Sequence, residues 1–102
     1  MIRYKLSARA KREVFDIWLY IARENIEAAD RVEAAIYDAC EFVAANPMAG
    51  GVRTELTGLP LRFWGIPGFP SYLLVYSPHR KPLLILRVLH GARDLRREVK
   101  RR

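Results

Sequence analysis

Residues 83–102 read Leu83-Leu84-Ile85-Leu86-Arg87-Val88-Leu89-His90-Gly91-Ala92-Arg93-Asp94-Leu95-Arg96-Arg97-Glu98-Val99-Lys100-Arg101-Arg102. The apolar run over 83–89 predicts a buried β-strand that ends at His90-Gly91. From Arg87 to Arg102, seven basic side chains stand against two acidic ones, a net of +5 out of the chain's +7. Positive charge therefore gathers directly after a core strand. This indicates a polyanion, or a strongly acidic protein surface, as the partner.

The length of 102 residues predicts one domain that spans residues 1–102. Apolar residues make up 51% and charged residues 28%, which is typical of a globular rather than a disordered chain. The single Cys40 has no partner for an internal disulfide. No charged leader followed by an apolar segment opens the chain. No apolar stretch approaches the length of a membrane span. We therefore expect a soluble, cytoplasmic protein without a membrane partner.

The first half of the chain predicts a short strand and a helical hairpin. Residues 2–6 alternate weakly between apolar and basic side chains, and Ser7 is suited to cap a helix that runs to about Asn25. A second helix is expected from Ile26 to Ala45, ending at Asn46-Pro47, because the residue before a proline is pushed out of the helical region. The many alanines on the apolar stripe of this helix predict close, antiparallel packing of the two helices.

The second half predicts strands. Residues 48–60 are rich in glycine and irregular, and three strand-like runs follow over 61–66, 69–77 and 83–90 with short turns between them. We expect an antiparallel meander that the strand at residues 2–6 joins, hence an α+β fold with the helical hairpin packed on one face of a small, mainly antiparallel sheet.

Two finer expectations concern the last predicted strand and the residues after it. On that strand, the set Leu84, Leu86 and Val88 is expected to face the helices. A short basic helix is expected from about Ala92. Its inner side would carry Ala92, Leu95 and Val99.

The order strand, helix, helix, three strands and basic tail resembles the RelE/ParE superfamily of bacterial type II toxin–antitoxin toxins, and the ParE-like branch in particular. The resemblance covers almost the whole chain. The residues that carry it are Tyr4-Lys5-Leu6-Ser7 with Ala10, Ile17-Trp18, Tyr20-Ile21-Ala22, Asn46-Pro47 with Gly50, Gly58 with Arg62, Tyr72-Leu73-Leu74-Val75-Tyr76, and Arg87-Val88-Leu89-His90-Gly91-Ala92-Arg93-Asp94-Leu95.

The resemblance implies a toxin that arrests growth, a behaviour tied to stress responses, and that a cognate antitoxin neutralises in a hetero-oligomer. In the ParE branch the target is DNA gyrase, which is the expectation here. In the RelE branch it is messenger RNA on the ribosome, so a ribosome-dependent endonuclease is the alternative. A non-toxic basic module that binds nucleic acid is a third hypothesis, of another class.

If the chain is a ribonuclease, its candidate catalytic residues are Arg62, Arg87, His90 and Arg93. Cleavage of RNA through its own 2′-hydroxyl needs a base, an acid and cations on the phosphate. The ribonuclease branch typically adds a tyrosine or histidine near its end, but none follows His90 in this chain. The set therefore looks incomplete, His90 is more simply a structural residue, and we expect no catalytic site.

Under the binding hypothesis, a basic cluster contacts the target or the antitoxin. Its members are Arg93, Arg96, Arg97, Lys100, Arg101 and Arg102. Like charges four residues apart on a helix destabilise it unless an acidic partner covers them. Strand aromatics are expected in the core or at the antitoxin rather than stacked on bases, namely Phe63, Trp64, Tyr72 and Tyr76.

No metal or cofactor is expected. One cysteine and two distant histidines do not make a zinc site, and no glycine-rich phosphate loop is present. The helical acids are expected only to solvate exposed faces; these are Glu13, Asp16, Glu24 and Glu27.

Overall fold

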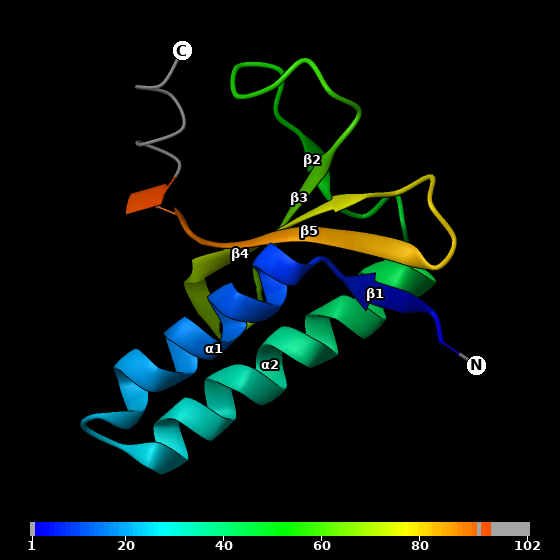
Figure 1. The fold of residues 1–102 in the computed structure, drawn as a ribbon. Helices are drawn as coiled ribbons and strands as arrows, with labels where there is room; N and C mark the ends of the chain where they lie inside the picture. The colour runs from blue at the N-terminus through cyan, green and yellow to red at the C-terminus, as the bar shows by residue number, and fades with distance from the viewer. Residues whose placement is uncertain (1, 92, 95–102) are drawn as a thin grey trace.

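Two helices cover one face of a five-stranded sheet in the structure, a computed structural model that describes residues 2–91, 93 and 94 (Figure 1). The chain runs in the order β1 (Tyr4–Leu6), α1 (Ala8–Ala22), α2 (Ile26–Ala45), β2 (Gly51–Val52), β3 (Arg62–Ile66), β4 (Phe69–Ser77) and β5 (Leu83–His90). The predicted α+β class, with a helical hairpin on a small sheet, is confirmed.

Local capping signals set the bounds of both helices. The Ser7 hydroxyl accepts the N–H of Ala10 at 3.0 Å, which confirms Ser7 as the N-cap of α1. The side chain of Asn25 accepts the N–H of Ala28 at 2.9 Å and so caps α2. The first helix therefore ends at Ala22 rather than near Asn25, because Asn25 begins the next helix.

The sheet has the strand order β1-β5-β4-β3-β2. β1 lies parallel to β5, with Tyr4 opposite Leu83 and Leu6 opposite Ile85, and the other neighbours are antiparallel. The mainly antiparallel prediction is therefore confirmed. β1 is shorter than the predicted 2–6, and the segment 48–60, expected to be irregular, contains the two residues of β2.

The predicted inner face of β5 is wrong for Leu84 and Leu86 and right for Val88. Val75 pairs with Arg87 but Tyr76 pairs with Ile85, so Leu86 is an extra residue in β5. Such a bulge interrupts the alternation of side chains between the two faces. As a result Leu83 and Ile85 join the core in place of the expected Leu84 and Leu86, whereas Val88 lies in the core as expected.

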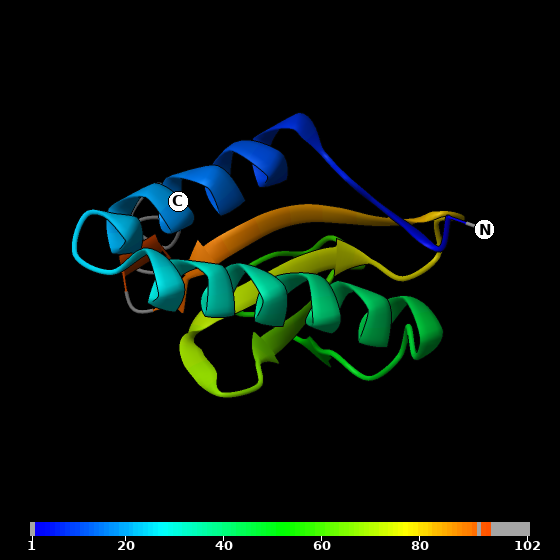
Figure 2. The same ribbon diagram turned by 90° about the horizontal axis from the view of Figure 1, so that it is seen from below.

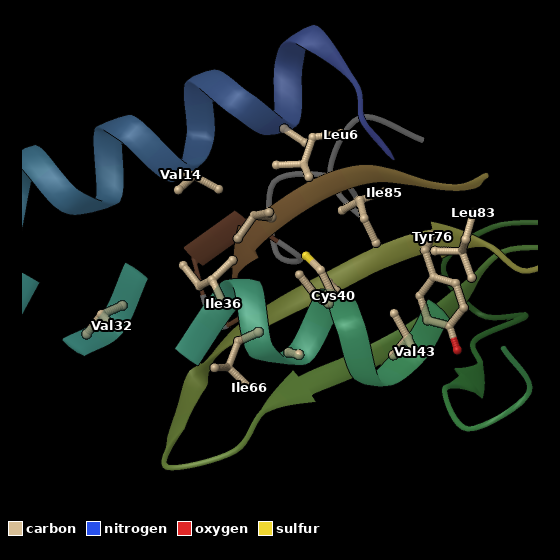
Figure 3. Packing of buried hydrophobic residues seen from close by; sticks show 14 residues of the cluster. Leu6, Val14, Val32, Ile36, Cys40, Val43, Ile66, Tyr76, Leu83 and Ile85 are labelled. Atoms are coloured by element: carbon tan, nitrogen blue, oxygen red, sulfur yellow. The ribbon is translucent and has the colours of Figure 1, made fainter. Parts of the chain in front are cut away.

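The core fills the space between the helices and the sheet. Figure 3 shows Leu6 of β1, Ile36 and Cys40 of α2, and Ile85 of β5 in one cluster. Burial raises the pKa of the Cys40 thiol to about 12, so Cys40 packs as a small apolar side chain.

The basic helix predicted from about Ala92 falls mainly on residues 92 and 95–102, which lie outside the described part of the chain. Its predicted inner residues Ala92, Leu95 and Val99 are among them.

Candidate functional site

A cleft of about 590 Å³ opens between α1 and the C-terminal end of β5. We call it the α1–β5 cleft. Figure 2 shows α1 running alongside β5. One side of α1 contributes Arg9, Glu13, Asp16, Tyr20 and Arg23. The opposite wall comes from β4, β5 and the residues after β5: Tyr72, Arg87, Val88, His90, Arg93 and Asp94.

The cleft exists because β1 covers only part of the edge of β5. The pairing of β1 with β5 ends at Leu6 and Ile85, and the chain turns into α1 at Ser7. Beyond that point no strand of the described residues adjoins this edge of β5, so its backbone donors must find other acceptors.

Glu13 supplies the hydrogen-bond acceptors at this edge. Its carboxylate accepts the N–H of Val88 at 2.9 Å and the Nε–H of Arg87 at 3.0 Å, and the second guanidinium contact is 2.8 Å. The side chains of Glu13 and Arg87 are each 19% exposed, so the pair is largely removed from water. Our expectation that Glu13 only solvates an exposed face is wrong. No local pattern reveals its role, because Arg87 and Val88 are 74 and 75 residues away along the chain.

His90 ends β5 and starts the next segment. Its own N–H donates to Asp94 at 2.7 Å, and its ring Nδ1 accepts the N–H of Arg93 at 3.3 Å. A side chain that accepts the N–H three residues further on is an N-cap, and the return bond to Asp94 resembles a capping box. The ring also meets Tyr72 edge-to-face, with 5.6 Å between centroids. These contacts give His90 a structural role at the mouth of the cleft.

Arg93 and Asp94 place opposite charges beside His90. The Arg93 Nε–H donates to Asp94 at 3.1 Å, and this bond raises the pKa of the Arg93 guanidinium. The Arg93 side chain is 60% exposed whereas that of Asp94 is 16% exposed. The cleft therefore contains an accessible guanidinium, that of Arg93. Its partner Asp94 also accepts the backbone N–H of His90.

The structure brings together three of the four residues proposed for ribonuclease chemistry. Arg87, His90 and Arg93 all line the α1–β5 cleft, and Arg62 does not. Arg62 pairs with Tyr76 near one end of β4, whereas His90 pairs with Tyr72 towards the other. The Arg62 guanidinium donates to the carbonyls of Gly50 at 2.7 Å and Met48 at 3.3 Å, so it anchors a loop.

Of the basic cluster predicted to bind a partner, only Arg93 lies in the described part of the chain. The others lie outside it: Arg96, Arg97, Lys100, Arg101 and Arg102.

The strand aromatics have separate surroundings. Tyr76 is fully buried, and burial raises the pKa of its phenol. Trp64 stacks on Phe42 with 5.1 Å between ring centroids, and the guanidinium of Arg53 lies 5.9 Å from the Phe63 ring. Tyr72 is the aromatic of the predicted set that lines the cleft. Tyr76 is thus a core residue as expected, and the other three rings are partly exposed.

Comparison with known protein families shows to which family the chain belongs. The family model of the ParE toxin of type II toxin-antitoxin system, parDE, matches residues 4–95. The chain belongs to the ParE toxin family. No curated protein matches it.

The ParE fold is also found among solved structures. The chain is similar to one described as "Chromosomal ParDE TA system from P. aeruginosa", with a TM-score of 0.69. The two share 19% sequence identity over 88% of this chain and 96% of that chain. At this identity the likeness concerns the fold, and the two-helix, five-strand arrangement of this ParE chain agrees with it.

The described residues of this ParE chain contain no group of histidine, cysteine or acidic side chains that would hold a metal ion. Within the same residues, no helix is long and apolar enough to cross a membrane.

Proposed function

We propose that this ParE-family toxin arrests growth by binding and inhibiting DNA gyrase, and that a cognate antitoxin neutralises it. The observation that carries the proposal is the family match over residues 4–95, which covers the whole described fold including the α1–β5 cleft. The cleft supplies arginines, tyrosines and a histidine at a protein surface, and aromatic residues and arginine are enriched in protein–protein interfaces.

The groups in the cleft support binding over catalysis. RNA cleavage needs a free base and a free acid beside the phosphate. In the described residues, Nδ1 of His90 accepts a backbone N–H, so only Nε2 of this ring is left for proton transfer, and the carboxylates of Glu13 and Asp94 bond to arginines and to backbone amides. The ribosome-dependent endonuclease remains the second candidate because Arg87, His90 and Arg93 share the cleft.

Pulse labelling after induction separates the two candidates. With gyrase as the target, DNA synthesis falls before protein synthesis, and purified toxin blocks supercoiling by purified gyrase. An early loss of translation with cleaved messages, reversed by Arg93→Ala in a stably folded protein, would refute the gyrase proposal. A variant that lacks toxicity because it does not fold is recognised by its lowered thermal midpoint.

A further inference from the structure

We propose that the α1–β5 cleft binds an acidic, extended segment of the antitoxin, and that Asp94 occupies part of this site as an internal substitute for a partner carboxylate. The identity of the partner rests on the proposed function; the chemistry of the site rests on the geometry alone.

The first observation is the edge of β5. Val88 and His90 are two residues apart on the strand, so their N–H groups point the same way. Each donates to a carboxylate, Val88 to Glu13 at 2.9 Å and His90 to Asp94 at 2.7 Å. The edge that a neighbouring strand would normally cover is therefore satisfied by acidic side chains. An acidic segment offers the same acceptors.

The second observation is the balance of charge. Four arginines and three acids line the cleft. Glu13 is bonded to Arg87 and Asp94 to Arg93. Within the described chain, no ion pair engages Arg9 or Arg23, and both are exposed. Arginine holds carboxylates through paired N–H donors, so these two side chains suit a partner's acids.

The third observation is the shape. Arg9, Glu13, Asp16, Tyr20 and Arg23 form a single stripe along α1, and all five line the cleft. From Arg9 to Arg23 this stripe extends over about 21 Å at 1.5 Å per residue. Tyr20 is 72% exposed and lies between the two arginines. The fitting segment carries acids towards its ends and an apolar residue beside the acid that meets Arg23.

Asp94 is the group that such a segment would replace. Its carboxylate holds the His90 N–H and pairs with Arg93 at 3.1 Å. Exchange of one carboxylate for another preserves the hydrogen bonds of the edge. An asparagine at position 94 keeps an oxygen for the His90 N–H but frees the Arg93 guanidinium and removes a negative charge from the cleft, so it should favour the incoming acid.

The test measures binding of a blocked hexaglutamate peptide to the purified full-length chain by calorimetry, with hexaglutamine as the uncharged control. Arg9→Gln with Arg23→Gln should weaken hexaglutamate binding by at least ~10-fold. The matched pair Lys11→Gln with Arg31→Gln removes the same charge from exposed positions outside the cleft and should weaken it by less than ~3-fold. Asp94→Asn should tighten it by ~3-fold or more, and Asp38→Asn, an exposed acid on α2, should leave it unchanged.

The proposal is overturned if both arginine pairs weaken binding equally, if hexaglutamine binds as well as hexaglutamate, or if Asp94→Asn fails to tighten binding. The same variants are then measured against the antitoxin, with the same expected ranking. Because these measurements contain no gyrase, a toxin that fails to inhibit gyrase would refute the proposed target and leave this result standing.

Discussion

At the scale of single residues, the role of His90 distinguishes a toxin that binds its target from one that cleaves RNA. Its ring Nδ1 accepts the N–H of Arg93, and its backbone N–H donates to Asp94. The contact at Nδ1 leaves Nε2 as the ring nitrogen through which a general acid or base would reach a substrate, whereas an N-cap needs only an acceptor at the right distance. Substitution by a residue that caps but cannot exchange protons near neutral pH distinguishes the two roles.

We expect His90→Ala to lower the free energy of unfolding by about 0.5–2 kcal/mol through loss of the cap. His90→Asn should restore most of that stability, because asparagine is among the best N-cap residues, and it should restore toxicity in parallel. Chemical denaturation and a growth assay measure both. His79→Asn, in an exposed turn, serves as the control. Wild-type stability without toxicity in His90→Asn would show that the imidazole itself acts on the target, by contact or by catalysis, and would contradict a purely structural role.

Tyr76 is a second residue whose side chain holds the backbone in place through hydrogen bonds. Its hydroxyl accepts the N–H of Gly50 at 2.9 Å and donates to the carbonyl of Pro47 at 2.7 Å. A Cβ at position 50 would lie 2.7 Å from that oxygen and 2.9 Å from the carbonyl oxygen of Phe63. Glycine is therefore required at position 50, and the loop after α2 is tied to the centre of the sheet.

Tyr76→Phe should lower the free energy of unfolding by about 1–3 kcal/mol, because the buried Gly50 N–H and the part-buried Pro47 carbonyl lose their partner. Tyr20→Phe removes the same atom from a side chain that is 72% exposed and should change stability by less than ~0.5 kcal/mol. Urea denaturation of both variants measures the difference. Equal effects would show that the Tyr76 hydroxyl does not anchor the loop.

Residue-level signals of short range were predictable from the sequence. Ser7 and Asn46-Pro47 act on neighbours within a few positions, and both bound their helices as expected. The acceptors at the edge of β5 were not predictable, since Glu13 meets partners more than seventy residues away. Candidate cleft residues such as Arg87, His90 and Arg93 were found because they are close in sequence, and Arg62 was grouped with them on chemistry alone.

At the scale of elements, α1 is fastened to β5 at two places. Ser7 donates its hydroxyl to the Leu86 carbonyl at 2.8 Å, and Glu13 holds Arg87 and Val88. Both contacts lie at or just after the bulge, where β5 has lost its β1 neighbour. The bulge is the reason that periodicity misassigned the inner face of β5. Alternation alone carries no information about an extra residue.

We expect Glu13→Ala to lower the free energy of unfolding by about 1–3 kcal/mol, because it strips acceptors from a mostly buried guanidinium and a backbone amide. Glu13→Gln should lower it less, since its amide oxygen still accepts one hydrogen bond. Asp16→Ala, an exposed acid one turn further along α1, is the control and should be nearly neutral. Thermal and urea unfolding give the values. A neutral Glu13→Ala would mean that α1 does not depend on this contact.

At the scale of the whole molecule, charge is unevenly distributed. Residues 8–46, which hold both helices, contain eight acids and five bases, whereas the chain as a whole carries +7. The excess of positive charge comes after β5 in the sequence, and Arg93 is the member of this basic segment that lines the α1–β5 cleft. The segment that follows β5 is therefore expected to attract an acidic partner most strongly.

Truncation after Gly91 should weaken both toxicity and antitoxin affinity. It removes six basic and two acidic side chains and lowers the formal net charge from +7 to +3. A full-length variant with glutamine at positions 96, 97, 100 and 101 has the same net charge and tests whether charge is the cause. Growth arrest and antitoxin titration are the measurements. A folded, truncated chain that stays fully toxic and is neutralised normally would contradict the role assigned to these residues.

The parallel pair of β1 and β5 has a consequence for the order in which the fold is made. The two helices contact each other through nearby residues, so the hairpin can form while the rest is still being synthesised. β1 can pair only after Leu83–Ile85 have been synthesised. The Ser7 hydroxyl likewise needs the carbonyl of Leu86, which lies 79 residues further along the chain. Contacts so distant in sequence form late and slowly. The α1–β5 cleft is therefore completed only after β5 has been synthesised and has paired with β1, later than the helical hairpin.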